Sequence, residues 1–461
     1  MYTALLIVNR TPMPIKKVRA LANSLLKGAL AILDQGLVSG SNFVIGILLA
    51  RWLTAKEYGA YAVAFGIFLL VANLYQSWVI EPMCVFGPST HRGSLRAYLK
   101  SLMWIYCGTI LVITICLGFS AAFALRIAPA SQLPRALLGV AIATPAILLF
   151  WSIKRVFYLQ LSPAPSALAA CVYCAVAGTG LWLLYQRGAM SPFSAFLLMG
   201  IAALGTSLPL WFWLQFRLPR TTLQPSHRAA LSQHWHYGKW AMVSAALMWV
   251  PMNIFYPLLS SFSGIDRAGE LKALMNLASP VLQTYGALSA LLLPYTSRAQ
   301  QEGGPLRAAA LARLISWLFA AGAAFYWVIL LIFKESIFHA LYSGRYMNVT
   351  GLLPVVALSS VAWSAFLGPA TGLRALQSPS LIMIAVSAST VVSLILGVPA
   401  VYVFGLSGAV WAMTLSEILG FAVTLLFLEV RVRSGTDLLN VEYGLLAPLI
   451  RKPVMHPQSG N

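Results

Sequence analysis

An acidic residue, Asp34, lies inside the first long apolar stretch of the sequence, in the segment LAILDQGLVSG. An ionised carboxylate within a bilayer costs about 2.5–3.5 kcal/mol on insertion scales, so such a residue is expected to face the protein interior. The chemistry it offers is proton or cation coupling, and a buried acid with a structural hydrogen bond is the alternative. Glu417, in TLSEILG of the last apolar stretch, follows the same argument. Asp34 and Glu417 are therefore the ion-coupling candidates.

Polar amides form a second group of residues within the apolar stretches. Asn73 and Gln76 are three residues apart, so they share one face of a helix. Helix–helix hydrogen bonds, at about 0.6 kcal/mol each, are sufficient to explain such residues. The functional alternative is a polar substrate cavity, and its candidate lining residues are Asn42, Asn73, Gln76, Asn253, Asn276 and Gln283.

Cations at the ends of the apolar stretches form a third group. A long cationic side chain there can extend to lipid headgroups, which is the simpler interpretation for any one of them. An anionic substrate would need some of them as first contacts, because charge-assisted hydrogen bonds are the main way to hold a diphosphate. The candidates for diphosphate contact are Lys27, Lys239, Lys272, Arg298 and Arg374.

No metal, cofactor or catalytic residue is expected. Cys171 and Cys174 form a CxxC pattern inside an apolar stretch, where small packing residues one helical turn apart are the simpler interpretation. His234 and His236 fall in a loop with no other ligand type nearby, which argues against metal binding.

The composition indicates which elements position these residues. Of 461 residues, 59% are hydrophobic and 9% are charged, with a mean hydropathy of +0.80. Soluble domains carry about 25% charged residues, so most of this surface must face lipid. A helix needs about 20 apolar residues to cross the hydrocarbon core, and the sequence predicts an all-α integral membrane protein with about twelve such helices. Their ranges are 28–50, 59–81, 101–125, 136–153, 164–185, 193–214, 240–262, 271–293, 311–333, 351–370, 380–403 and 408–430.

The positive charge follows the predicted topology. Most of the 31 Lys and Arg residues fall in the N-terminal segment, the even-numbered loops and the C-terminal tail, which twelve spans place on one side. The positive-inside rule makes that side the cytoplasm and places both termini there. The net charge of +20 therefore reflects topology and contact with anionic lipid in the bilayer, and no nucleic-acid partner is expected.

Two six-helix bundles are predicted, and a faint internal repeat supports them. Leu48-Leu49 precede Gly59 by the same distances at which Leu258-Leu259 precede Gly269. Repeats of this kind place the substrate site of a transporter between the halves. The expected organisation is a cytoplasmic tail (1–25), an N-terminal bundle (26–214), a cytoplasmic linker (215–239), a C-terminal bundle (240–430) and a cytoplasmic tail (431–461).

Prolines and short loops carry two further expectations. Pro251 and Pro257 interrupt the seventh span, where we expect a bend. The segment 334–350 is the longest loop expected outside the cytoplasm. It is too short for the ordered catalytic domain that a membrane glycosyltransferase or polymerase needs, so no enzyme is expected.

Three segments resemble a known family. DQGLVSGSNFVIGILLARWLTAKEYGAYAVAFGIFLL is similar to the opening of bacterial Wzx-like polysaccharide flippases of the MOP superfamily. ALYSGRYMNVTGLLPVVAL resembles that family's G-x-Y element before the tenth span, followed by the LRALQSP turn, and FGLSGAVWA resembles its turn into the last span. The resemblance covers Asp34 to about Leu428 and rests on mostly structural motifs.

The resemblance implies a flippase that moves undecaprenyl-diphosphate-linked oligosaccharide repeat units across the bacterial inner membrane. Such units build O-antigen and exopolysaccharide, so the polymerase and export machinery of the same pathway are the implied partners. It also implies alternating access by two bundles and coupling to an ion gradient or membrane potential, without a strict catalytic motif.

Other functions remain open at this stage. A cation-coupled multidrug exporter of the MATE type would also use an acid in the first span. A flippase of the peptidoglycan precursor is less similar, because its first helices carry several arginines and this first span carries none inside. A membrane polysaccharide polymerase or glycosyltransferase is the alternative from a different class.

Overall fold

A computed structural model describes residues 15–91, 93–160, 162–218 and 227–433 of the 461-residue chain, with side chains from Leu26 onward. Most of the predicted C-terminal tail, the first part of the N-terminal tail and the centre of the predicted linker lie outside these ranges. The chain divides into two compact units, which we describe separately. Unit 1 comprises Met1–Trp249 and Gly264–Asn276, and unit 2 comprises Val250–Ser263 and Leu277–Asn461. The bundle boundaries expected from the sequence stay predictions.

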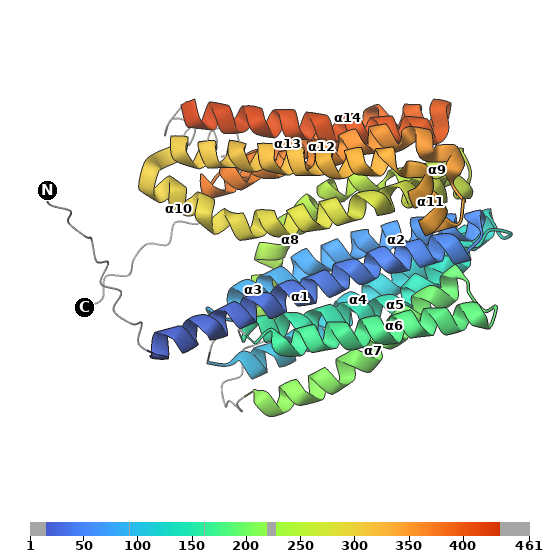
Figure 1. The fold of residues 1–461 in the computed structure, drawn as a ribbon. Coiled ribbons are helices and arrows are strands. Elements are labelled where there is room, and N and C mark those ends of the chain that lie inside the picture. The colour runs from blue at the N-terminus through green and yellow to red at the C-terminus, as the bar shows by residue number, and fades with distance from the viewer. Residues whose placement is uncertain (1–14, 92, 161, 219–226, 434–461) are drawn as a thin grey trace, which may run out of the picture. The chain divides into compact units, whose positions relative to one another are not determined.

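Unit 1 is built from helices that run alongside one another (Figure 1). They are α1 (Ile15–Trp52), α2 (Ala55–Tyr75), the π-helical turn η1 (Gln76–Ile80), α3 (Glu81–Phe86), α4 (Leu95–Ile127), α5 (Leu133–Leu159), α6 (Ala164–Gln186), α7 (Pro192–Arg217), nearly all of α8 (His227–Asn253) and the start of α10 (Ile265–Ile332). The tightest packing joins α5 to α7 and α4, and α1 to α6.

Unit 2 packs its helices around α12 and α14. It holds α9 (Phe255–Phe262), the rest of α10, α11 (Lys334–Tyr342), the 3-10 turn η2 (Met347–Leu352), α12 (Leu353–Ala375), α13 (Pro379–Ile395) and α14 (Gly397–Arg433). A core of small and apolar side chains, including Ala308, Ala312 and Phe319 of α10 and Leu373 of α12, lets these helices approach closely.

The described residues confirm the predicted membrane class. Nine helical segments are long and apolar enough to cross a membrane, and a tenth arises if α8 and α9 form one span. α10 joins two helices across non-helical Gly303 and Gly304, so it accounts for two predicted ranges. α13 is apolar but has 17 residues, and the predicted range there also includes the start of α14 before its kink at Gly405. About twelve spans therefore have helical counterparts.

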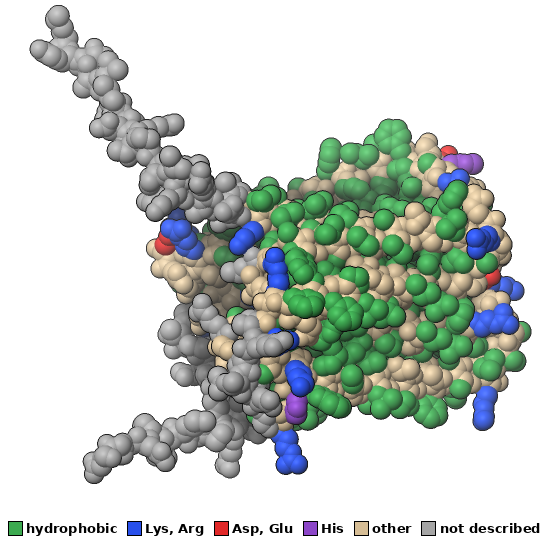
Figure 2. All heavy atoms as spheres, turned by 90° about the horizontal axis from the view of Figure 1, so that it is seen from below, with side chains coloured by type: hydrophobic (Ala, Val, Ile, Leu, Met, Phe, Trp, Pro, Cys, Tyr) green, Lys and Arg blue, Asp and Glu red, His purple; other side chains and the backbone are tan. Residues whose placement is uncertain are grey.

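The surface agrees with a protein that lies in lipid. Figure 2 shows a face on which hydrophobic side chains fill a broad middle zone, while Lys and Arg side chains gather at its two ends. Large apolar side chains such as Phe119, Phe216 and Trp317 are more than two-thirds exposed. In water, protein molecules with such a surface would aggregate, whereas a bilayer with apolar chains and anionic headgroups accommodates it.

Helix starts and breaks follow from local sequence. Thr54 caps α2 through a capping box, in which its hydroxyl accepts from the Glu57 amide and the Glu57 carboxylate accepts from the Thr54 amide. The bend predicted from Pro251 and Pro257 is confirmed, because α8 and α9 meet at 48°. Proline removes a helical hydrogen bond and clashes with the preceding turn, which explains the break.

Two loop predictions need correction. The linker expected over 215–239 is helical from His227, so α8 begins well before the predicted span. Lys154 and Arg155 follow the predicted span 136–153 and would fall in an even-numbered loop, but they lie inside α5, which continues to Leu159. Both errors have the same cause, because a polar residue near a span end does not stop a helix whose other face is packed.

Candidate functional site

Asp34 is held by two side chains of α5. It is 2% exposed, and the Lys154 Nζ lies 2.6 Å from its Oδ1. The Tyr158 hydroxyl donates a hydrogen bond of 2.6 Å to its Oδ2. Lys154 and Tyr158 are four residues apart, so both stand on the face of α5 whose side chains reach Asp34. The carboxylate that the sequence singled out is therefore part of a buried ion pair rather than a solitary acid.

Lys154 is the residue of this candidate site that the sequence analysis missed. Only 9% of it is exposed, and its Nζ also lies 5.2 Å from the centre of the Phe150 ring. The signal in the sequence was the spacing of a lysine and a tyrosine one turn apart at the end of an apolar stretch. A single lysine in such a place is otherwise indistinguishable from one that extends to headgroups.

A cavity of about 320 Å³ opens beside the ion pair within unit 1. Besides Asp34, Lys154 and Tyr158, Arg155 and Trp151 of α5 also line it, and Gln76 of η1 lies on its wall. Arg155 is exposed and lies 5.9 Å from the Tyr158 ring. With Gln35 of α1, the lining holds two cations, one carboxylate, an indole ring, two amides and a phenol, which suits a polar anionic ligand.

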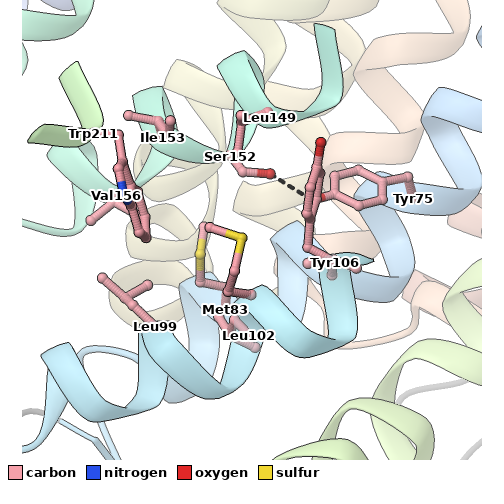
Figure 3. A pocket seen from close by; sticks show the side chains of 12 residues that line it. Tyr75, Met83, Leu99, Leu102, Tyr106, Leu149, Ser152, Ile153, Val156 and Trp211 are labelled. Atoms are coloured by element: carbon pink, nitrogen blue, oxygen red, sulfur yellow. Dashed lines mark hydrogen bonds between the residues drawn. The ribbon is translucent and has the colours of Figure 1, made fainter. Parts of the chain in front are cut away.

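The opposite face of α5 is apolar and closes a second, smaller pocket. Figure 3 shows Leu149, Ile153 and Val156 of α5 facing Met83 and Leu99 around it. Its volume is about 40 Å³. The charged residues Lys154 and Arg155 of α5 thus lie on the face that lines the first cavity, and the opposite face carries apolar side chains together with Ser152.

The π-helical turn η1 forms part of the cavity wall. Such turns insert one extra residue into a helix and occur frequently at functional sites. The turn begins at Gln76, which lines the cavity, and the preceding Tyr75 hydroxyl lies 2.6 Å from the Ser152 hydroxyl on α5 (Figure 3). The Ser152 hydroxyl in turn donates to the Leu148 carbonyl at 2.8 Å. These bonds tie the end of α2, directly before η1, to the face of α5 that lines the second pocket.

Of the six predicted cavity amides, Gln76 lines this cavity. Asn276 is buried, and its Nδ2 donates to the Tyr58 hydroxyl at 2.8 Å. This hydrogen bond joins two helices, which is the structural alternative to a substrate-binding role for Asn276. The other four lie elsewhere on their helices: Asn42 and Asn73 are exposed, and Asn253 and Gln283 are partly buried.

None of the five predicted diphosphate contacts, all of which the structure describes, lines the Asp34 cavity. Lys272 is partly buried, with its Nζ 4.6 Å from the Phe65 ring centre, and Lys239 lies 5.7 Å from the Trp240 ring centre. Arg298 pairs with Glu302 at 2.6 Å. Lys27 and Arg374 are exposed. The cations that the structure brings to the cavity are instead Lys154 and Arg155.

Glu417 and His234 lie apart from this cavity. Glu417 is partly buried in α14 of unit 2, so the two ion-coupling candidates belong to different units. His234 is in α8 rather than in a loop, and it is fully buried, with its ring nitrogens 2.9 Å from the Tyr98 hydroxyl and 3.0 Å from the Trp78 carbonyl. Among the described residues no group of three metal-ligating side chains gathers.

Several solved structures are similar to this chain. A MATE multidrug transporter of the MOP superfamily in its inward-facing conformation matches with a TM-score of 0.70 at 14% identity, over 88% of this chain and 98% of its own. The fold is that of the MATE transporters. The lipid II flippase MurJ in an inward closed conformation shares it, with a TM-score of 0.63 at 12% identity over 93% and 94% of the two chains. The MATE multidrug transporter DinF-BH, solved with a bound compound, also matches, at 0.62 and 15% identity over 91% and 96%.

The comparisons confirm the predicted fold class of an all-α, MATE-like membrane protein. They do so at identities of 12–15%, where the fold alone is shown. No protein-family model matches the chain, and no curated protein is significantly similar to it. The arrangement around Asp34 therefore carries the argument for function.

Proposed function

We propose that this chain is a flippase that translocates undecaprenyl-diphosphate-linked oligosaccharide repeat units from the cytoplasmic to the outer leaflet. It would work in the bacterial inner membrane by alternating access, for O-antigen or exopolysaccharide biosynthesis. The observation that supports this proposal is the cavity of unit 1, where Lys154 and Arg155 stand beside a single carboxylate, Asp34, and beside Trp151.

The energetics of the substrate demand such a cavity. A glycan cannot cross hydrocarbon, because each unpaired polar group costs several kcal/mol in an apolar environment. Cations and amides that bind the diphosphate and hydroxyls replace their hydration, and an aromatic ring offers an apolar face to a sugar. Trp151 and Gln76 lie beside the two cations in this way. The polyprenyl tail stays in lipid throughout.

The residues that line the cavity lie toward the side where we expect the substrate to be made. α1 is the first span and α5 is the fourth, so alternation places the start of α1 and the end of α5 on one side. Asp34 lies in the first half of the apolar segment Leu26–Trp52 of α1, and Lys154 lies near the end of α5. The charge distribution of the sequence makes this side cytoplasmic and places both termini there. A lipid-linked unit assembled in the cytoplasm would therefore reach the cavity first.

A MATE-like multidrug exporter is the second candidate, and the structural neighbours favour it. Two of them are described by name as multidrug transporters. The electrostatics of the site point the other way. A cationic compound or a coupling cation needs an available carboxylate, whereas Asp34 is already paired with Lys154 and has Arg155 beside it. A site with excess positive charge selects anions.

The neighbours also bear on the enzyme alternative, since the matching proteins are a flippase and transporters rather than polymerases or glycosyltransferases. The proposed partners are the polyprenyl-diphosphate-linked glycan, the bilayer, and the polymerase and export machinery of the same pathway.

The experiment that tests the proposal is the glycolipid profile of a strain without this chain. We expect an undecaprenyl-linked repeat unit to accumulate on the cytoplasmic leaflet and surface polysaccharide to be lost. Complementation with the wild-type chain should restore both, and the Arg187→Gln variant, which changes an exposed cation outside the cavity, should do so equally. An unchanged glycolipid profile together with new sensitivity to cationic drugs would replace this proposal with the multidrug exporter.

A further inference from the structure

The Asp34–Lys154 pair poses a physical problem for anion binding. The pair is buried, and the charge of Lys154 is already balanced by Asp34, whose Oδ1 lies 2.6 Å from the Lys154 Nζ. Arg155 lines the same cavity, and it forms no ion pair among the described residues. A diphosphate entering the cavity meets a free guanidinium but must compete with Asp34 for the ammonium group.

This competition gives Asp34 a role besides ion coupling and packing, because Asp34 competes with the diphosphate for Lys154. The carboxylate occupies the place on Lys154 that a phosphoryl oxygen would take. It keeps the buried lysine paired while the cavity is empty, because an unpaired buried cation costs several kcal/mol. Asp34 is in this sense an internal substitute for the ligand.

We infer that the diphosphate displaces Asp34 from Lys154 and that Asp34 then takes up one proton. This inference rests on the proposed flippase function. The proton comes from water on the side to which the cavity is open. When the diphosphate leaves, the Asp34–Lys154 pair re-forms and the proton is released. No covalent bond is made or broken apart from this protonation.

The charge balance supports proton uptake. The charged residues that line the empty cavity are Asp34, Lys154 and Arg155, with a net charge of plus one, and the nearby acid Glu81 can only make the balance more negative. A diphosphate diester brings two negative charges, since each phosphoryl group keeps one ionised oxygen, and the sum becomes minus one. Protonation of Asp34 brings the site to zero. Neutrality matters because an uncompensated charge is strongly disfavoured in a low-dielectric, membrane-embedded cavity.

The surroundings of Asp34 offer the displaced carboxylate little other compensation. α5 contributes Lys154, Arg155 and Tyr158, and the two cations are the groups that the diphosphate engages. η1 contributes Gln76 and Ile80. α6 contributes Cys174, whose Sγ lies 3.5 Å from the Leu37 carbonyl. α3 carries Glu81, a second acid, on the side of Arg155. The amides of Gln35 and Gln76 also line the cavity, but among these neutral donors in the described part of the chain the Tyr158 hydroxyl is the one that donates to Asp34.

Tyr158 also makes the exchange feasible. A phenol can donate to an ionised carboxylate and can equally accept from a protonated one. The Asp34 side chain can therefore keep a partner in both states, and only the lysine has to move. Its long side chain on α5 lies at the wall of the cavity, where a shift of the ammonium toward a ligand needs no helix movement.

The test is calorimetry of the purified full-length chain in detergent micelles. The probe is a short-chain prenyl-diphosphate N-acetylglucosamine, titrated at the same pH in PIPES and in imidazole, which differ in their heats of ionisation. The difference between the two measured enthalpies gives the number of protons taken up on binding. We expect about one proton per bound probe.

The outcomes separate the two proposals. Binding of the probe without proton uptake overturns the exchange and leaves the flippase function standing. Failure of the probe to bind at all overturns the proposed function itself. The wild-type measurement decides both questions, so neither depends on a variant that folds poorly.

Two variants sharpen the result. Asp34→Asn should bind the probe at least as tightly as the wild type and should take up no proton, because Lys154 no longer has to be released from a carboxylate. Glu335→Gln, which changes an exposed acid on α11, should keep the wild-type proton uptake. Wild-type proton uptake in Asp34→Asn would overturn the assignment to this residue.

Discussion

Gly59 of α2 packs directly against Gly269 of α10 within unit 1. A Cβ atom on Gly269 would lie 2.9 Å from the Gly59 backbone nitrogen and 3.1 Å from the Ala55 carbonyl oxygen. A Cβ atom on Gly59 would collide with the Ile265 carbonyl oxygen. The two glycines also hold equal places after the leucine pairs of the sequence repeat. The backbones of α2 and α10 therefore meet where the two halves of the sequence correspond.

The crossing is sensitive to added volume. We expect Gly59→Ala to lower the free energy of unfolding by at least the roughly 1–3 kcal/mol that overpacking costs, because the blocking atom is backbone and cannot move aside. The measurement is thermal unfolding of the purified chain in detergent. Gly118→Ala is the matched control, since a Cβ on this α4 glycine meets nothing within 4 Å. Equal stability of the two variants would contradict the close contact.

The ion pair should respond as a unit. Lys154→Gln leaves Asp34 buried without its counter-charge and should destabilise the chain by about 3–5 kcal/mol. Adding Asp34→Asn to this variant should restore most of the loss, because two neutral side chains remain. A double-mutant cycle on thermal unfolding measures this coupling. Additive effects of the two changes would show that they do not interact.

Transport should depend on Asp34 beyond its contribution to stability. We expect Asp34→Asn to be less stable than the wild type, because the buried Lys154 loses its counter-charge, but still to insert into the membrane. It should translocate less lipid-linked glycan, because the re-forming ion pair no longer helps to release the diphosphate. The assay is restoration of surface polysaccharide in the deletion strain at matched protein level. Wild-type transport by Asp34→Asn would remove this residue from the mechanism.

Arg155 is the most accessible cation of the cavity and should contribute to affinity with little effect on stability. A hydrogen bond to a charged group contributes about 1.5–3 kcal/mol, so Arg155→Gln should weaken binding of the diphosphate probe by about tenfold or more. Calorimetric titration gives this ratio. Arg187→Gln removes an exposed arginine that does not line the cavity, and it should bind as the wild type does.

Tyr158→Phe isolates the hydrogen bond to Asp34. Loss of this bond to a charged group should lower the free energy of unfolding by about 1.5–3 kcal/mol and should leave the ion pair with Lys154 in place. Thermal unfolding of Tyr158→Phe beside Tyr402→Phe, an exposed tyrosine of α14, gives the comparison. A change as large as that of Lys154→Gln would mean that Tyr158 holds more than one contact.

The helices could be predicted from the sequence, because the length of an apolar stretch and the position of a proline determine local structure. It identified Asp34 and the bend at Pro251 and Pro257 for the same reason. It could not identify the partner of Asp34, since the fold alone brings Lys154, 120 residues further along the chain, within 2.6 Å of it. The roles of Gln76 and Asn276 also diverge only in three dimensions: one lines the cavity, and the other binds Tyr58. The π-helical turn at Gln76 depends on packing that no local pattern encodes.

The pairing of α1 with α5 also bears on how the chain is made. Tyr158 follows Asp34 by 124 residues, and Lys154 lies one turn before it, so the first span is synthesised long before its counter-charge exists. Until the fourth span has been synthesised, the unpaired Asp34 carboxylate raises the free energy of inserting the first span by about 2.5–3.5 kcal/mol. Docking of the fourth span against the first would then be the step that commits the nascent chain to the bilayer. Ribosome-bound fragments that end before Lys154 should be held less firmly in the membrane than fragments that include it.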